Sequence, residues 1–482
     1  MPILTHALAI GLLFTAAVEP ALKMPSIETS VSSGQAIGTT PDAGKEARSS
    51  TTAPNENAPD VARSAEAATP SESKHQPAAK SVSLEVQEMA EMPAAVVGTP
   101  QVKQSFEIAF SGYLRAFYST FLPEKFFGVP TPKSMDNQGN PFVGRNDGFG
   151  LSGARLNVRG TLGENLYLRL GFDGALVNYE DTLDSVGGLA TGLKDAYIRW
   201  RFGDSMNLFV GRFKPPFDME ELTATEDQQF VHRALESRGV KRHEGYATHM
   251  GGFAPGRQMG VMLSDDAVFG LGAMDFGYGL AITNGNRGGG YLNDNDLPAV
   301  YGRFFTSWGS AGVSSDEEGP STQIKRESGG VLGVAGYFNQ KTTGAEPEKF
   351  AERDIGLGVD THMSYWGIEF QGQVMMSWLE RLDAPLSKAQ QSLGGHAQLA
   401  YAFGDSGFEL AYRYAFYNPR FVSADESGDD STYHGVSHNT VGLRYLFETM
   451  PAIFYIEYTH SGEFSGRELA NDRVETAIQV TF

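Results

Sequence analysis

The sequence predicts an all-β protein, a transmembrane antiparallel β-barrel of about 16 strands, preceded by a disordered N-terminal linker. Apolar and polar residues alternate along most of the chain after about residue 105. The connections between these stretches alternate between short turns and long polar loops. Beyond the N-terminus there is no run of about 18 apolar residues, so transmembrane helices are not expected there.

The C-terminal residues 473–482 show the alternation most clearly. Val474, Ile478 and Phe482 fall on one face of the expected strand, and Glu475 and Gln479 fall on the other. Residues 165–173, 195–202 and 408–416 repeat this pattern. A soluble β-sandwich also alternates, but bulky aromatic residues near the strand ends favour the girdles of a membrane barrel.

The expected strands form an even-numbered set, as a closed antiparallel barrel with both termini on one side requires. They cover residues 105–120, 151–162, 164–177, 193–203, 205–214, 256–264, 268–283, 298–307, 330–340, 353–362, 364–380, 391–403, 407–418, 437–447, 452–460 and 473–482.

The connections support the same topology. Short turns are expected at residues 163–164, 203–204, 264–267, 363, 404–406 and 448–451, and long loops at 121–150, 215–255 and 419–436. In such barrels the short turns face the periplasm and the long loops face outward. The connection 308–329 is long where a short turn is expected, so either a strand register is missed there or the loop is an insertion.

Composition narrows the function classes. The 57 glycines, 31 phenylalanines and 19 tyrosines suit a sheet with tight turns. The absence of cysteine excludes thiolate zinc sites, thiol catalysis and disulfides. A net charge of −20 argues against binding nucleic acid, because that affinity comes largely from Lys and Arg. No cofactor and no metal site are expected.

The N-terminal part divides into two segments. Residues 1–22 contain a short apolar run and are expected to be a signal peptide, although no Lys or Arg precedes the run; an apolar tail is the alternative. Residues 23–104 are rich in Ala, Ser, Thr, Pro and Glu and have too few apolar residues to offset chain entropy. We expect a disordered periplasmic linker there, either a spacer or a tether, and the barrel at 105–482.

The most specific motif follows the fifth expected strand. Residues 208–217 read LFVGRFKPPF, followed by EELT at 220–223 and FVHRAL at 230–235; GARL at 153–156 and KDAYIR at 194–199 are weaker matches. On these motifs, residues from about 105 to 482 resemble the phosphate-selective porin O and P family. The resemblance implies a sixteen-stranded outer-membrane barrel, usually a homotrimer, that admits small anions past a constriction loop. Phe482 is similar to the C-terminal residue that the barrel-assembly machinery recognises.

A pore selects anions through fixed positive charge along its narrow part, and the alternation assigns a set of basic side chains to the lumen. An Arg facing lipid near the midplane costs about 2–4 kcal/mol, so these side chains are expected to face inward. The Arg fork also suits phosphate oxygens. The expected set is Arg155, Arg159, Arg169, Arg199, Arg201, Arg212, Lys214, Arg413 and Arg444.

The segment after the fifth strand adds further basic residues, Arg233, Arg238, Lys241, Arg242 and His243. Helical spacing over residues 220–238 would leave Leu222, Phe230, Val231, Ala234 and Leu235 to pack against the barrel wall. If this loop folds inward, its basic end could form the eyelet. Inward acids could pair with the arginines, however, so anion selectivity, weak selectivity and cation selectivity all stay open. The candidates are Asp173, Asp195, Glu409 and Glu475.

Other motifs do not indicate catalysis. The GDSG string at 404–407 lies in an expected hairpin turn, where these residues are ordinary turn formers. The GFGLSG string at 148–153 opens a strand, whereas a nucleotide-binding loop opens a helix. We therefore expect a passive channel whose partners are outer-membrane lipid and small anionic solutes, and no enzyme. An outer-membrane enzyme, an attachment barrel and a soluble β protein are the alternatives.

Overall fold

The structure is a computed structural model. It describes residues 106–122, 148–177, 189–203, 205–240, 244, 251–285, 297–309, 328–343, 350–382, 389–422, 435–464 and 471–482. The expected signal peptide and linker lie outside these residues.

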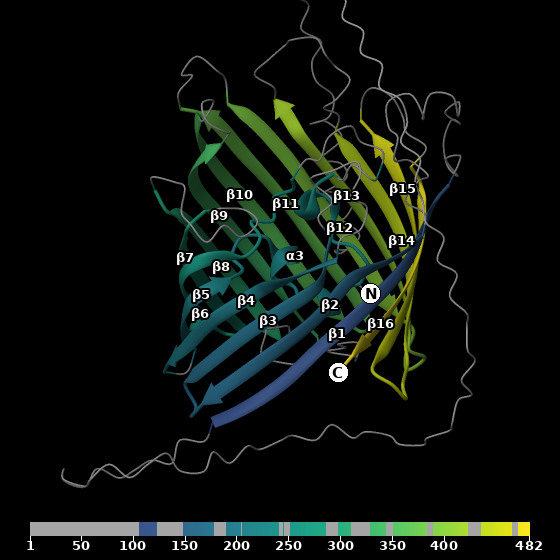
Figure 1. Ribbon diagram of the computed structural model, residues 1–482, viewed down its shortest axis with the longest axis horizontal. Helices are drawn as coiled ribbons and strands as arrows, with labels where there is room; N and C mark the ends of the chain where they lie inside the picture. Colours follow the sequence, from purple (N-terminus) through teal and green to yellow (C-terminus); the bar gives the residue numbers. More distant parts are fainter. Residues whose placement is uncertain are drawn as a thin grey trace, which may run out of the picture. The chain divides into compact units, whose positions relative to one another are not determined.

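Sixteen antiparallel strands form a closed barrel (Figure 1). Each strand pairs with its neighbours in sequence, and β1 pairs with β16, so the sheet has no edge. At the closure Phe482 donates its backbone N–H to the Gly112 carbonyl, and Gly112 donates to the Phe482 carbonyl, at 3.0 and 2.9 Å. Closure is required in lipid, because an unpaired backbone group there finds no water. The predicted barrel and its strand number are confirmed.

The strand bounds follow the expected pattern closely. The strands are β1 (Phe106–Phe121), β2 (Gly148–Leu162), β3 (Leu166–Val177), β4 (Leu189–Phe202), β5 (Met206–Phe213), β6 (Gln258–Leu271), β7 (Met274–Thr283), β8 (Ala299–Gly309), β9 (Gly329–Thr343), β10 (Phe350–Tyr365), β11 (Ile368–Arg381), β12 (Gln390–Ala402), β13 (Phe408–Val422), β14 (Val436–Leu446), β15 (Ala452–Glu463) and β16 (Arg473–Thr481).

Two expected turns were misplaced. The β6–β7 turn lies at Gly272, which has φ of 67°, and not at 264–267, where β6 continues with a register shift. The β10–β11 turn lies at Trp366 and Gly367, with φ of 52° and 79°, and not at residue 363. Two consecutive positive φ values match a tight hairpin turn, which glycine favours. Residues 310–327 lie outside the described part, but Gly309 and Gly329 pair at the short-turn end of the barrel.

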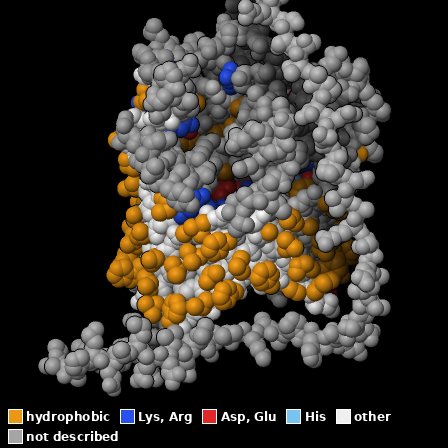
Figure 2. Space-filling model, viewed as in Figure 1, with side chains coloured by type: hydrophobic (Ala, Val, Ile, Leu, Met, Phe, Trp, Pro, Cys, Tyr) orange, Lys and Arg blue, Asp and Glu red, His pale blue; other side chains and the backbone are white. Residues whose placement is uncertain are grey.

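The two faces of the sheet differ as the alternation predicts. Val334, Leu357 and Val359 point outward and are more than half exposed, whereas the alternate residues Asp354 and Asp360 are buried inside. Figure 2 shows hydrophobic side chains gathered in a band around the lower part of the visible wall. Within the described residues, no helix has the length and apolar character needed to cross a membrane.

The long connection between β5 and β6, residues 214–257, is called the inner loop here. It contains α3 (Met219–Leu222), the 3-10 turn η1 (Thr225–Asp227) and α4 (Leu235–Arg238). The helical spacing over residues 220–238 therefore does not give one continuous helix. The backbone is extended at Thr223 and Ala224, and barrel side chains take up some of the N–H groups that a helix would use internally.

Candidate functional site: a loop across the barrel

The inner loop is packed inside the barrel, where Figure 1 shows α3 surrounded by strands. Phe217 and Leu235 are each 1% exposed and share an apolar cluster with the wall residues Tyr337, Met375 and Tyr417. Phe230 packs with Ala400 and Ala411, and Val231 with Tyr455 and Ala477. Phe230, Val231, Ala234 and Leu235 are thus buried as expected, and Leu222 is partly buried.

On one side, β1 and β16 anchor the loop through Arg115. This side chain is fully buried, and its guanidinium donates to the carbonyls of Thr225 and Val231 at 2.6 and 3.2 Å. The Gln479 side-chain oxygen accepts from Arg115 Nε at 2.8 Å. One arginine therefore fixes two points of the loop backbone.

Neighbouring acids on β15 and β16 complete this anchor. Glu457 accepts a hydrogen bond from the Val231 N–H at 2.6 Å. Glu475 contacts His232 at 2.9 Å and Arg473 at 3.0 Å. The expected inward acid Glu475 thus holds the loop.

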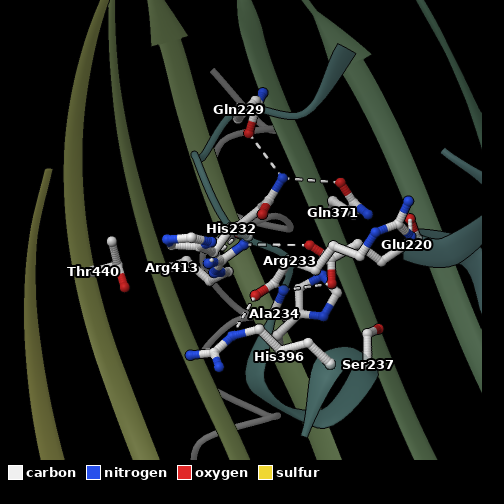
Figure 3. A network of polar contacts seen from close by, with 12 residues as sticks. Glu220, Gln229, His232, Arg233, Ala234, Ser237, Gln371, His396, Arg413 and Thr440 are labelled. Atoms are coloured by element: carbon white, nitrogen blue, oxygen red, sulfur yellow. Dashed lines mark hydrogen bonds and ion pairs between the residues drawn. The ribbon is translucent and has the colours of Figure 1, made fainter. Parts of the chain in front are cut away.

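Further along the same part of the wall, β11 to β13 hold the loop through a second network (Figure 3). Arg413 donates to the His232 carbonyl at 2.9 Å and to Glu220 at 3.3 Å, and its guanidinium lies 4.3 Å from the Phe230 ring centroid. His396 Nδ1 lies 2.5 Å from Glu236 Oε1. The loop is therefore fastened at several points along the run of wall strands from β1 through β16 to β12.

Several of the predicted basic residues lie beside acids. Arg155 lies 4.0 Å from Glu226, Arg233 lies 3.0 Å from Glu221, and Arg238 lies 2.6 Å from Glu244. Arg444 pairs with Glu409 at 2.5 Å. The positive charge expected of an eyelet is thus largely matched by loop and wall carboxylates. Lys241, Arg242 and His243 lie outside the described residues.

Five of the expected arginines gather on the inner face of β2, β3 and β4, here called the basic wall. Arg159 faces Arg169 across β2 and β3, and the Arg199 guanidinium lies 4.0 Å from the Tyr167 ring centroid on β3. The basic wall consists of Arg155, Arg159, Arg169, Arg199 and Arg201. On the same three strands Asp173 and Asp195 are the buried inward acids, so positive charge is in excess there.

Two basic residues lie elsewhere than expected. In the strand register Arg212 pairs with Ala196 on β4 and with Met259 on β6. It lies on the same face of β5 as Val210, which points outward. Its Nε donates to the Lys194 carbonyl at 3.0 Å. Arg212 is near a strand end, where an outward charge costs less than at the midplane. Lys214 follows the strand and donates to the carbonyls of Leu222 and Thr223 inside the inner loop.

Other buried cations inside the barrel were missed from the sequence. Arg115 lies between Leu114 and Ala116, and Arg473 lies on the polar face of the alternating segment 473–482, so strand parity would have identified both. Arg303 also lies on an inward position and donates to Asp360 at 2.6 Å. Arg257, which contacts Asp195 at 2.7 Å, lies outside any strand and carries no such signal.

Burial and neighbouring charges shift the pKa values of the loop acids. Burial alone would raise the pKa of Glu244, but the Arg238 and Arg473 guanidiniums outweigh it and hold that pKa well below its usual range. Burial would also raise the pKa of Glu221, but the Arg233 and Arg257 guanidiniums outweigh it and lower that pKa. At Asp218, burial and then Glu220 raise the pKa to about 7. The loop is thus anionic where it meets arginines.

Replacing Arg115 with Met is expected to lower the free energy of unfolding by about 3 kcal/mol, because buried carbonyl acceptors lose their donor. Urea titration followed by heat-modifiable gel migration would measure this loss. The matched control is R353M, since Arg353 pairs with Glu380 and is 42% exposed at its side chain; it should cost less than about 1 kcal/mol. Equal losses in both variants would contradict an anchoring role for Arg115.

The Glu244 pairs should make stability depend on pH at the acid end. A carboxyl with a lowered folded pKa contributes stability above its unfolded pKa, near 4.5, and loses it as pH falls through the folded pKa. E244Q should therefore lower the free energy of unfolding at pH 8 by about 3–5 kcal/mol, measured by urea titration. It should also flatten the decline of that free energy as the pH falls below 4.5. Parallel pH profiles for E244Q and the wild type would refute this.

Part of the sequence matches one protein family. Residues 134–317 match the model of the family described as phosphate-selective porin O and P. None of the curated proteins matches the sequence. The match and the closed barrel indicate a channel rather than an enzyme, and they support a porin function in the outer membrane.

Solved structures with a similar barrel include several outer-membrane proteins. The outer membrane channel DcaP of Acinetobacter baumannii is 14% identical with a TM-score of 0.47, covering 78% of this chain and 97% of its own. The anion-selective porin from Comamonas acidovorans is 12% identical with a TM-score of 0.47, covering 78% and 100%. OmpT, an outer membrane protein of Vibrio cholerae, is 11% identical with a TM-score of 0.45, covering 78% and 98%.

The sequence match spans β2 to β8 and therefore contains the basic wall and the whole inner loop. The resemblance of this chain to the phosphate-selective porin O and P family is confirmed, and residues 134–317 carry the sequence pattern of that family.

Proposed function

We propose that this protein is a porin for passive diffusion of small solutes, with a preference for anions such as phosphate. The observation that carries this proposal is the basic wall, five arginines on three adjacent strands inside the matched segment. Fixed positive charge along a pore attracts anions and partly replaces their lost hydration. The arginine fork also suits the oxygens of a phosphate ion.

The basic wall differs in charge from the remainder of the lumen. On the far strands, inward acids such as Asp360 and Glu409 pair with Arg303 and Arg444. The inner loop brings its own acids to Arg233 and Arg238. An anion would therefore travel along β2 to β4, where inward arginines outnumber inward acids, and the loop arginines would serve mainly to hold the loop.

A weakly selective general porin is the second candidate function. The ion pairs of Arg155, Arg233, Arg238 and Arg444 favour it, because a paired charge produces a weaker field in the pore than an isolated one. A barrel that serves for attachment is the third candidate, and the segment 23–104 would then be a periplasmic tether.

We further propose that the porin is a homotrimer and that the barrel-assembly machinery recognises the last strand. Phe482 lies beside β1, where its backbone closes the sheet, so β16 must be placed correctly for closure. The implied family is usually trimeric, and the outward wall is apolar enough to meet either lipid or another subunit.

The test is the zero-current potential of the purified protein in a planar bilayer under a KCl gradient. We expect a chloride-selective potential. The variant R159Q/R169Q/R199Q/R201Q should lower the chloride-to-potassium permeability ratio about fivefold, because a unit charge about 4 Å from an ion in water is worth about 1 kcal/mol. R238Q/K241Q/R242Q tests the alternative basic eyelet, and R353Q is the outward-facing control.

Each result separates the candidates. Loss of chloride preference only in the loop variant would move the selectivity site from the basic wall to the eyelet. A potential near zero in the wild type would favour the weakly selective porin. A potassium-selective potential would contradict the anion proposal, and folded protein without channel events would favour the attachment barrel.

A further inference from the structure

We propose that the joint between the inner loop and the barrel wall is a buried site for one divalent transition-metal ion, formed by Glu220, Glu236 and His396. One ligand atom from each side chain lies within 4.8 Å of the other two. The three residues are 4%, 0% and 5% exposed. This proposal does not depend on the selectivity of the pore.

The three candidate ligands come from three separate elements. Glu220 lies on α3, Glu236 on α4 and His396 on β12, and Figure 3 shows Glu220 and His396 converging at the joint. An imidazole and two carboxylates suit Zn²⁺ or Mn²⁺. Metal–ligand bonds of about 2.0–2.2 Å place two ligand atoms of one ion up to about 4 Å apart. The three ligand atoms here, which lie within 4.8 Å of one another, need to move only slightly closer.

A second observation points to a missing ligand. Four buried polar atoms at this joint have no hydrogen-bond partner among the described residues, namely Glu236 Oε2, His396 Nε2, Asp218 Oδ2 and Gln373 Oε1. Gln373 faces His396 across β11 and β12, and its Nε2 contacts Asp218 and Glu236 at 2.9 and 3.0 Å. A buried polar group without a partner costs about 1–3 kcal/mol, so four of them together indicate an absent ligand.

The charges at the joint favour a cation as that ligand. The carboxyl groups of Asp218 and Glu236 meet at the Gln373 side-chain amide, and the carboxyl group of Glu220 contacts the Arg413 guanidinium. The adjacent Glu221 is occupied by Arg233 and Arg257. Glu220 accepts from the Ala234 N–H and from Arg413, but each carboxylate oxygen has a second lone pair that a cation could use.

The His396–Glu236 contact leaves two atoms available for the ion. His396 Nδ1 contacts Glu236 Oε1 at 2.5 Å, and the other nitrogen and oxygen of the pair, Nε2 and Oε2, have no hydrogen-bond partner among the described residues. Saturation at one ion per chain therefore distinguishes binding at this joint from loose adsorption at the acidic surface.

The sequence carries no metal motif for this site. Glu220 and Glu236 belong to different turns of the inner loop, and His396 lies far along the chain. Only the seating of the loop against β12 brings the three together. The ion would act as a cross-link between the loop and the wall.

The experiment uses the full-length protein, refolded in detergent after EDTA treatment and held at pH 8. Zn²⁺ or Mn²⁺ is titrated by calorimetry, and thermal unfolding is followed by heat-modifiable gel migration. We expect one saturable ion per chain and a midpoint about 5 °C higher with ion in large excess over its Kd.

H396A and E236Q should abolish the saturable binding and the thermal shift. The matched controls H362A and E369Q remove a His–Glu pair of similar separation, 3.0 Å, that is partly exposed, and both should bind like the wild type. If H396A does not fold, X-ray absorption of the wild type with Zn²⁺ should show one imidazole nitrogen and carboxylate oxygens. No saturable binding by the wild type, or undiminished binding by E236Q, would overturn the proposal.

Discussion

The closed sheet is the constraint on which the remaining structure depends. A strand in lipid can satisfy its backbone only through its neighbours, and here the pairing of β1 with β16 removes the last edge. Closure fixes the direction of every side chain, because successive residues point to opposite faces. Outward positions must then be apolar, and charged residues are directed into the lumen.

A barrel of sixteen strands is too wide for its own side chains to fill, and the inner loop occupies part of that space. Its position is determined by polar contacts as much as by packing. Arg115 and Glu457 hold one part of the loop against β1 and β15, and Arg413 and His396 hold another part against β13 and β12. A buried charge without a partner is costly, so the wall arginines and the loop acids require one another.

The sequence predicted most of the fold because strand parity is a local signal. The alternation at 473–482 and the glycine turns were sufficient to locate the strands, and misplaced turns arose where a strand continued through polar residues, as β6 does past Asp265. The site was harder to predict. Arg155 was correctly expected to be an inward residue, but its partner Glu226 lies on the loop, and no local pattern connects the two. Arg212 was predicted to face the lumen but faces outward, because a charge near a strand end can point outward at a lower cost than at the midplane.

The inner loop is seated across the lumen against β12, and a disulfide between the two would test this directly. The chain has no cysteine, so a disulfide between E236C and G394C reports this contact alone. A Cβ at Gly394 would lie 2.6 Å from the Cβ of Glu236, and disulfides have Cβ atoms about 3.8 Å apart. We predict near-complete oxidation, seen as faster non-reducing migration, and none in the control E236C/G372C, whose second cysteine is on the outward face of β11. Two freely reactive thiols in E236C/G394C would contradict the account.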